Sequence, residues 1–581
     1  MNLPSPHRLR FGPFEVDTRS GELLRHGSRV DLQDQPFQAL VMLLERPGDV
    51  VTRDEFSRAL WPGNTFVDYE RGLNKAINKL RAALRDNAEK PRYIETLPHR
   101  GYRFIATVEK VAPVGDGDRP QPPLQINSLA VLPLANLTGD PAQEYFSDGL
   151  TEELICAISR IPSLRVISRT SAMSFKGTRK PLADIARELA VDAVVEGSVS
   201  RSGDRVRVIA QLILARDDRH IWAGRYERDL GDILHLQADV AQNIATQINK
   251  AVDPRRAFPD QSRHINPKAY EAYLKANFFR DKLTPLEMLK SLEFYTRAVD
   301  LDPSYARAHG ELSMAYFYLG LFGIEPPAVM FSKSRASAVR ALELDETVAA
   351  AHNALAVVHV FYDWDWVSAE KECRRAVELS PGEPAGYVHL ADYLSIRGRH
   401  REAIDTFRHV LELDPISRVY IGYFGLLLHR ARQYDESIAQ CQRALEIDPH
   451  CVNAMWFMAL SLEQKGDLDG AVERLETAVN LARAPHFLAL LGRAHALTGE
   501  RQVARGVLEE MTALAQRMYV SPFDLAIVHA GLGDLPTAFA CFEDAFQQRV
   551  FRIIELTLPM FDNLRSDARW QDLARRVGLR D

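Results

Sequence analysis

The chain has 581 residues, of which 46% are hydrophobic and 26% charged, and its formal net charge is −6. The composition is typical of a globular protein, and the length exceeds what one core can organise, so we expect three or more domains. Five scattered cysteines without a CxxC spacing argue against disulfides and structural zinc. No apolar run approaches the roughly 18 residues that span a bilayer, so we expect a cytoplasmic protein.

The N-terminal segment, residues 1–110, differs from the rest in charge. Residues 1–108 contain 17 Lys or Arg and 14 Asp or Glu, so this segment is mildly basic. The remainder of the chain is acidic. The stretches LRFGPFEVD and ELLRHGSRVDL alternate apolar and polar residues around glycines, which predicts a small antiparallel sheet. Helical patterns follow at 36–46, 53–61 and 69–85, and Thr52 with Glu55 forms the capping-box pattern before the second.

The third helical pattern has two distinct faces. Its apolar residues recur at helical spacing and make one stripe: Leu73, Ala76, Ile77, Leu80 and Leu84. The other face carries polar and basic side chains: Arg71, Asn74, Lys75, Asn78, Lys79, Arg81 and Arg85. In a major groove, Arg and Lys read guanine edges, Asn reads adenine, and the remaining cations hold phosphates. Taken alone, however, a charged helix face is more often simply solvated.

The stretch YIETLPHRGYRF, residues 93–104, predicts a β-hairpin with a cationic tip at His99 and Arg100. The order of elements, a sheet, three helices and a hairpin closing with GYRF, resembles the OmpR/PhoB-type winged-helix family over nearly all of residues 8–108. The specific matches are the LW pair at residues 60–61, RGLNKAINKLRAAL and YIETLPHRGYRF. The resemblance implies binding of double-stranded DNA, with the helix in the major groove and the wing in the minor groove.

Carried over by position, the family's base and phosphate contacts fall on Arg71, Asn78, Lys79, Arg81 and the wing. Asn78 stands where many relatives carry Arg, so the DNA sequence that this protein recognises cannot be inferred from that of a relative. The resemblance also suggests that the loop from Pro62 to Tyr69 touches RNA polymerase, although a plain connector is an equally good interpretation. Whether two copies of the protein bind DNA as a homodimer stays open at this point.

The run APVGDGDRPQPPLQ predicts a linker at residues 111–126. About seven residues precede the first predicted strand, which leaves no room for the phosphate-accepting receiver of response regulators. The linker is too hydrophilic for the membrane span that CadC-like relatives place there. We therefore expect a one-component bacterial regulator.

Residues 127–250 mix strand and helix patterns and predict an α/β domain. The motifs SLAVLPLANLTGD, YFSDGLTEELI and VVEGSVSRSGDRVRV resemble the TolB-like (FlgO-like) family, which supplies no catalytic residues to transfer. We interpret Asp148, Glu152 and Glu153 as an acidic helix start that complements the helix dipole, in preference to an acid or metal cluster.

Residues 267–581 are repetitive. The endings AVDLDP, ALELDE, AVELSP, VLELDP, ALEIDP and AVNLAR begin at residues 298, 341, 376, 410, 444 and 478, and four of the five intervals are 34 or 35. That period predicts an all-α tetratricopeptide solenoid whose concave face binds an unidentified protein or peptide. An insertion is expected near GLFGIEPPA, the cluster FYDWDW should belong to the core, and FDNLRSDARWQDLARRVGL should cap the solenoid.

The usual nucleotide, hydrolase and zinc motifs are absent from the sequence, and 17 histidines are dispersed without ligand spacing. We therefore expect no catalytic residues, cofactor or metal. The sequence predicts a multidomain protein with an N-terminal α+β winged helix-turn-helix, a middle α/β domain and a C-terminal all-α solenoid. Its predicted function is transcription regulation through DNA binding, with the repeats receiving the regulatory signal through protein–protein interaction. One alternative is a tetratricopeptide scaffold whose winged helix is vestigial or protein-binding, and a less favoured one is an enzymatic or small-ligand role for residues 127–250.

Overall fold

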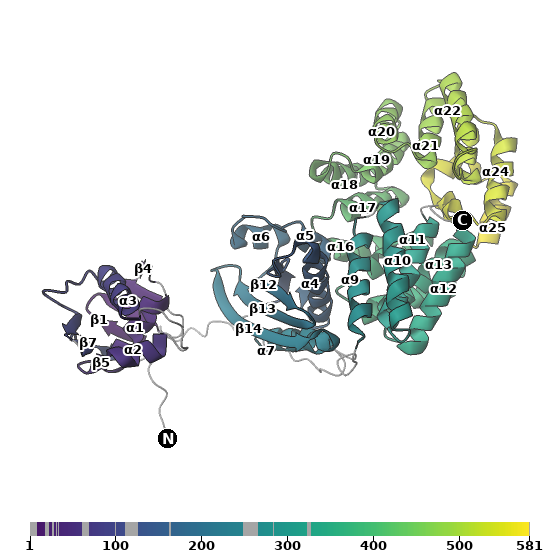
Figure 1. The fold of residues 1–581 in the computed structure, drawn as a ribbon. Helices are drawn as coiled ribbons and strands as arrows, with labels where there is room; N and C mark the ends of the chain where they lie inside the picture. Colours follow the sequence, from purple (N-terminus) through teal and green to yellow (C-terminus); the bar gives the residue numbers. More distant parts are fainter. Residues whose placement is uncertain are drawn as a thin grey trace. The chain divides into compact units, whose positions relative to one another are not determined.

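The computed structural model describes residues 8–17, 22–25, 28–30, 32, 34–60, 69–98, 100–110, 126–161, 164–247, 265–282, 284–321 and 327–579. The chain divides into two compact units, Met1–Pro123 and Leu124–Asp581 (Figure 1). Three predicted features lie outside the described residues: nearly all of the loop before the third helix, the linker up to residue 125, and the insertion at 322–326. No described helix is long and apolar enough to cross a membrane.

The first unit contains the predicted sheet, three helices and hairpin. Its elements are β1 (Arg8–Phe11), β2 (Phe14–Asp17), β3 (Glu22–Arg25), β4 (Ser28–Val30), α1 (Asp34–Glu45), β5 (Val50–Thr52), α2 (Arg53–Leu60), α3 (Tyr69–Leu84), β6 (Ile94–Leu97), β7 (Gly101–Phe104) and β8 (Glu109–Lys110). The strands form a five-stranded sheet in the order β4-β3-β2-β1-β8 and a three-stranded sheet in the order β5-β7-β6. The winged-helix prediction is confirmed.

The apolar stripe of α3 forms much of the core of this unit. Leu73, Ile77, Leu80 and Leu84 are each at most 1% exposed and pack with α1 and the hairpin strands. Burying this stripe turns the opposite face of α3 to solvent, because the helical period separates the two faces. The predicted capping box is also present: the Glu55 amide donates to Thr52 Oγ1 at 3.3 Å, and the Thr52 amide donates to Glu55 Oε2 at 2.8 Å.

Gly101 begins the second wing strand, where β7 pairs closely with β5. Its φ is +155°, and an added Cβ would lie 2.0 Å from the carbonyl oxygen of Val51. Only glycine therefore fits this strand start without moving the backbone.

We predict that Gly101→Ala lowers the free energy of unfolding of the first unit by about 2 to 4 kcal/mol, because backbone strain and a backbone clash add. Gly48→Ala is the matched control: its φ is +86° but nothing lies within 4 Å of the added Cβ. That control should cost only about 1 kcal/mol. Urea unfolding of residues 1–123 measures both, and equal losses would contradict the close approach of β5 and β7.

The second unit begins with a six-stranded mixed sheet. Its strands and helices are β9 (Ser128–Val131), β10 (Ala135–Asn136), η1 (Pro141–Gln143), α4 (Glu144–Ser159), β11 (Arg165–Val166), α5 (Arg169–Met173), α6 (Leu182–Leu189), β12 (Ala193–Ser202), β13 (Arg205–Leu214), β14 (Arg219–Asp229), η2 (Leu230–Asp232) and α7 (Ile233–Gln247). Strands β11, β9 and β12 pair in parallel, and β13 and β14 continue the sheet antiparallel. Helices α4 and α7 cover one face and α6 the other, which confirms the α/β prediction.

Paired helices follow. They are α9 (Pro267–Arg280), α10 (Pro285–Leu301), α11 (Ala306–Leu321), α12 (Pro327–Leu344), α13 (Ala349–Val358), the π-turn η4 (His359–Asp363), α14 (Trp366–Leu379), α15 (Pro384–Ile396), α16 (His400–Leu413), α17 (Arg418–Arg430), α18 (Tyr434–Ile447), α19 (Val452–Lys465), α20 (Leu468–Leu481), α21 (Pro485–Leu497), α22 (Arg501–Leu514), α23 (Pro522–Gly531), α24 (Leu535–Gln547), η5 (Phe551–Thr557), η6 (Pro559–Leu564) and α25 (Ala568–Val577). Small residues such as Ala391, Ala403 and Ala478 are at most 1% exposed where helices approach closely, as the repeat pattern predicts.

The middle sheet and the repeats share one core. Tyr270, Tyr273 and Leu274 of α9 are at most 2% exposed and belong to the same hydrophobic cluster as the sheet residues Leu129 and Val131. The two segments that the sequence separates at residues 250–267 therefore fold here as one body. Hydrophobic periodicity predicts the helices and strands of each segment, but it does not predict that the apolar faces of the two segments pack together.

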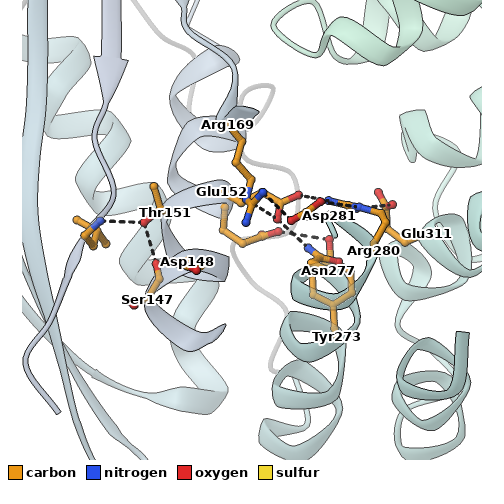
Figure 2. A network of polar contacts seen from close by, with 12 residues as sticks. Ser147, Asp148, Thr151, Glu152, Arg169, Tyr273, Asn277, Arg280, Asp281 and Glu311 are labelled. Atoms are coloured by element: carbon orange, nitrogen blue, oxygen red, sulfur yellow. Dashed lines mark hydrogen bonds and ion pairs between the residues drawn. The ribbon is translucent and has the colours of Figure 1, made fainter. Parts of the chain in front are cut away.

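A row of ion pairs crosses the junction between α4 and the first repeat (Figure 2). Arg280 Nη2 lies 2.7 Å from Glu152 Oε1, its Nη1 lies 3.0 Å from Glu311 Oε2, and Arg169 Nη1 lies 2.6 Å from Asp281 Oδ2. Burial alone would raise the pKa of Glu152, but the guanidinium groups of Arg280 and Arg169 outweigh it and lower that pKa.

These contacts correct the interpretation of Asp148, Glu152 and Glu153 as an acidic helix start. Helix α4 begins at Glu144, so all three lie beyond its first turn. Asp148 pairs with Lys176 at 2.6 Å, and Glu153 receives two bonds from Arg307, at 2.5 and 2.9 Å. They join segments of the fold, and no group of three or more His, Cys, Asp or Glu in the described part of the chain is arranged to hold a metal ion.

Candidate nucleic-acid interface

The exposed face of α3 gathers four of the predicted residues. Asn74, Lys75, Asn78 and Lys79 are exposed and, with Ala82, line a shallow, open hollow of about 520 Å³. Their spacing of three and four residues places them on adjacent turns of one helical surface. Two amide side chains and two cations thus lie side by side on a convex helix, the shape that enters a major groove.

Asn74 is oriented by its neighbours. The Tyr102 hydroxyl donates to Asn74 Oδ1 at 2.7 Å, and Arg53 Nη1 donates to the same oxygen at 3.4 Å. The Arg53 guanidinium also lies over the Tyr102 ring, 5.5 Å from its centroid. Because guanidinium groups only donate, the amide oxygen must face Arg53, and the Asn74 NH2 group is the part left to donate to a base or a phosphate.

Arg81 occupies a different environment. It is 8% exposed, and its Nη2 donates to the carbonyl oxygen of Ile94 at 2.9 Å and to Thr96 Oγ1 at 2.7 Å. The structure thus places this guanidinium between α3 and wing strand β6, apart from the four exposed side chains. The sequence spacing indicates this position, because Arg81 lies four residues after Ile77 and three before Leu84, at the edge of the apolar stripe.

The remaining predicted residues lie at the end of α3 and on the wing. Arg85 is exposed, with a φ of +53° just beyond the last helical residue. Arg100 is exposed at the wing turn, where its carbonyl accepts from the Arg53 amide at 3.3 Å. Arg103 pairs with Glu95 across the hairpin at 2.5 Å. His99 and the side chain of Arg71 lie outside the described residues.

Asp86 is a residue that the sequence prediction missed. Its carboxylate accepts from the backbone amides of Asn87, Arg92 and Ile94 at 3.0, 2.7 and 2.8 Å. These bonds fold the segment between α3 and β6 back onto the helix end. An aspartate two residues after the end of a helix is a known turn former, which is the one local signal that could have identified it.

Comparison with known families agrees with this geometry. Residues 27–104 match the family described as transcriptional regulatory protein, C terminal. Residues 384–417 and 428–494 match two families described as tetratricopeptide repeat. The first unit therefore contains an OmpR/PhoB-type winged-helix domain, and the second contains tetratricopeptide repeats.

Individual relatives cover different parts of the chain. "Transcriptional regulator HilA" of Salmonella typhimurium is 24% identical over 458 residues, 77% of this chain and 79% of that protein. "Transcriptional activator CadC" of Escherichia coli (strain K12) is 30% identical over 101 residues, 17% of this chain and 19% of CadC. "Putative adenylate cyclase 3" of Rhizobium meliloti (strain 1021) is 35% identical over 198 residues, 33% of this chain. The chain spans only 34% of the length of this last protein.

These relatives favour a transcriptional regulator over the scaffold alternative. The chain is homologous to the HilA and CadC regulators, and its match to HilA extends over most of both chains.

We predict that Arg81→Ala lowers the free energy of unfolding of the first unit by about 1 to 3 kcal/mol, because it removes the donor that the buried Ile94 carbonyl and Thr96 hydroxyl use. Lys75→Ala, a loss of charge on the exposed face of the same helix, should change it by less than about 0.5 kcal/mol. Chemical denaturation of residues 1–123 compares the two. Equal, small effects would mean that Arg81 does not hold the wing to α3.

Proposed function

We propose that this protein is a transcriptional regulator that inserts the exposed face of α3 into the major groove of double-stranded DNA. The observation that carries the proposal is the pairing of a fully buried apolar stripe with a face of Asn74, Lys75, Asn78 and Lys79, in a domain of a DNA-binding family. The relatives named as transcriptional regulators support it. We propose no catalytic role.

The chemistry of each side chain suggests its part in binding. Asn74 and Asn78 offer amide groups suited to an adenine edge, and Lys75 and Lys79 suit guanine or phosphate oxygens. Arg85 and Arg100, at the helix end and the wing turn, suit flanking phosphates or the minor groove. Arg81 acts as a positioning residue, because its guanidinium holds β6 against α3.

Three finer assignments rest on family resemblance. We propose that the loop ahead of α3 contacts RNA polymerase, that two copies bind DNA together, and that the middle sheet is a TolB-like domain. The repeats supply the protein-binding surface through which a signal reaches the regulator.

We predict that Asn78→Ala and Lys79→Ala each weaken binding to a duplex selected from a random pool by about 1 to 3 kcal/mol where the side chain reads a base. A lysine that contacts only phosphate should instead weaken all duplexes alike and reduce the salt dependence of binding. Electrophoretic mobility shifts of the full chain at several salt concentrations distinguish these cases.

The control is Arg10→Ala, which also removes one positive charge from the first unit. Arg10 lies on β1 of the five-stranded sheet and pairs with Glu15 of β2 at 2.5 Å. Its binding should match the wild type. Unchanged binding in both α3 variants, or no shift of any duplex at low salt, would contradict the proposed interface.

A further inference from the structure

The end of the chain does more than cap the solenoid. Helix α25 packs on α24, as a cap should, but the preceding segment, residues 550–565, takes another path. It forms two short 3-10 helices, η5 and η6, and contacts repeats that lie far earlier in the sequence.

The first contacts of this segment are with the repeats around α13 and α15. The rings of Phe551 and Phe361 lie 6.4 Å apart, and Arg549, directly before the segment, donates through Nη1 to the carbonyl oxygen of Tyr362 at 2.7 Å. Helix η5 also touches α15. The aromatic rings of the cluster FYDWDW are thus half-buried against the core of the repeats, and part of what they pack against is this C-terminal segment.

The later contacts reach the first helices of the following repeats. Arg432, just after α17, binds both carboxylate oxygens of Asp562 at 2.5 and 2.9 Å. Arg493 of α21 donates to the carbonyl oxygen of Met560 at 2.8 Å. Arg552 lies over the ring of Trp456 of α19 at 5.6 Å and pairs with Asp524 of α23.

One segment of about fifteen residues thus touches six successive repeats, in each case at the first helix or at the turn directly after it. On the outer side of a curved solenoid these helices diverge, so a short segment can reach all of them only along the inner side. The surface that a repeat solenoid offers to peptides is therefore filled by the chain itself. Helix α25 ends nearby: its Val577 carbonyl accepts from Trp366 Nε1 at 3.0 Å (Figure 1).

The groove and its occupant match in chemistry. Ile553 and Phe561 are fully buried, and Met560 is 3% exposed. Arg552 is 5% exposed and meets the acidic Asp524, while Asp562 meets the basic Arg432. Apolar anchors flanked by two charge pairs of opposite sense also fix the direction in which the segment lies.

The segment combines apolar and polar contacts with the repeats. Its apolar side chains, such as Ile553 and Phe561, belong to the same hydrophobic cluster as the repeat helices, and its charged side chains pair with groups of neighbouring helices. The Arg432–Asp562 pair is also accessible to solvent, with the two side chains 53% and 37% exposed. An apolar centre with a solvent-accessible polar rim is the usual composition of an interface between a protein and its bound partner.

We propose that the inner face of helices α13 to α23 is a peptide-binding groove and that residues 550–565 are its built-in, displaceable ligand. The partner it fits is another protein with a segment that presents an arginine, a pair of aliphatic residues, and a Phe-Asp pair nine residues after the arginine, as Arg552, Ile553, Ile554, Phe561 and Asp562 do. The intact chain excludes this partner until its own segment leaves. The inference concerns the repeats alone and stands whether or not α3 binds DNA.

The test uses the full chain with a protease site inserted between Gln548 and Arg549. The folded protein is cut, and a labelled synthetic peptide of residues 549–581 is added while its fluorescence polarisation is followed. We expect the peptide to enter the cut chain but not the uncut one. A Phe561→Ala peptide should bind at least about a hundredfold more weakly, because it lacks the main buried ring.

Charge reversal identifies the groove. An Asp562→Arg peptide should bind about fivefold more weakly or worse, since it loses an exposed bidentate pair and gains repulsion. The same peptide should recover affinity for a cut chain that carries Arg432→Asp.

Three results would overturn the proposal. In the first, the labelled peptide never exchanges into the cut chain. In the second, the repeats lose their helical circular dichroism when the segment is removed, which would make it a permanent part of the core. In the third, the uncut chain dimerises by exchanging C-terminal segments, which would assign the groove to a second copy and not to another protein.

Discussion

A buried arginine cannot give up its charge, so it must find acceptors for its donors wherever the chain places it. In this protein such arginines lie at the joints. Arg81 joins α3 to the wing, the half-buried Arg280 joins the middle domain to the first repeat, and Arg552 joins the last segment to α23. Removing either partner of such a pair leaves an uncompensated buried group, which makes each joint specific.

This constraint explains how the proposed DNA-binding surface keeps its shape. The apolar stripe of α3 decides which face is exposed, but it does not set the position of the wing. Arg81 and Asp86 do so, since one bonds to β6 and the other folds the intervening segment. The exposed amides and lysines therefore lie on a helix that is fixed against both the core and the hairpin. The proposed binding to DNA thus requires little ordering of this helix.

The second unit follows the same logic on a larger scale. The middle sheet shares a core with α9 and also meets the repeats further along, where the Ser168 amide donates to the carbonyl oxygen of Leu413 at 2.8 Å. The middle domain thus contacts the repeats at two places, and the C-terminal segment contacts the repeats along their inner side. The middle sheet, the repeats and the C-terminal segment in the groove therefore form one connected body.

Much of this architecture could be predicted from local patterns. The stripe from Leu73 to Leu84, the Thr52–Glu55 capping box and the 34-residue period each specify an element from its own residues. The burial of Arg81, the junction made by Glu152 and Glu153, and the filled groove could not be predicted in the same way, because each depends on partners far away in the sequence. A charged residue at the edge of an apolar stripe looks alike whether it faces DNA or a neighbouring strand.

The most direct test of the central claim is a titration of residues 1–123 with a selected duplex, followed by NMR of the side-chain amide groups. The account predicts that the NH2 resonances of Asn74 and Asn78 shift on binding, while the amides of strands β2 and β3 stay in place. Shifts confined to the N-terminal sheet, with the two asparagines unchanged, would contradict it.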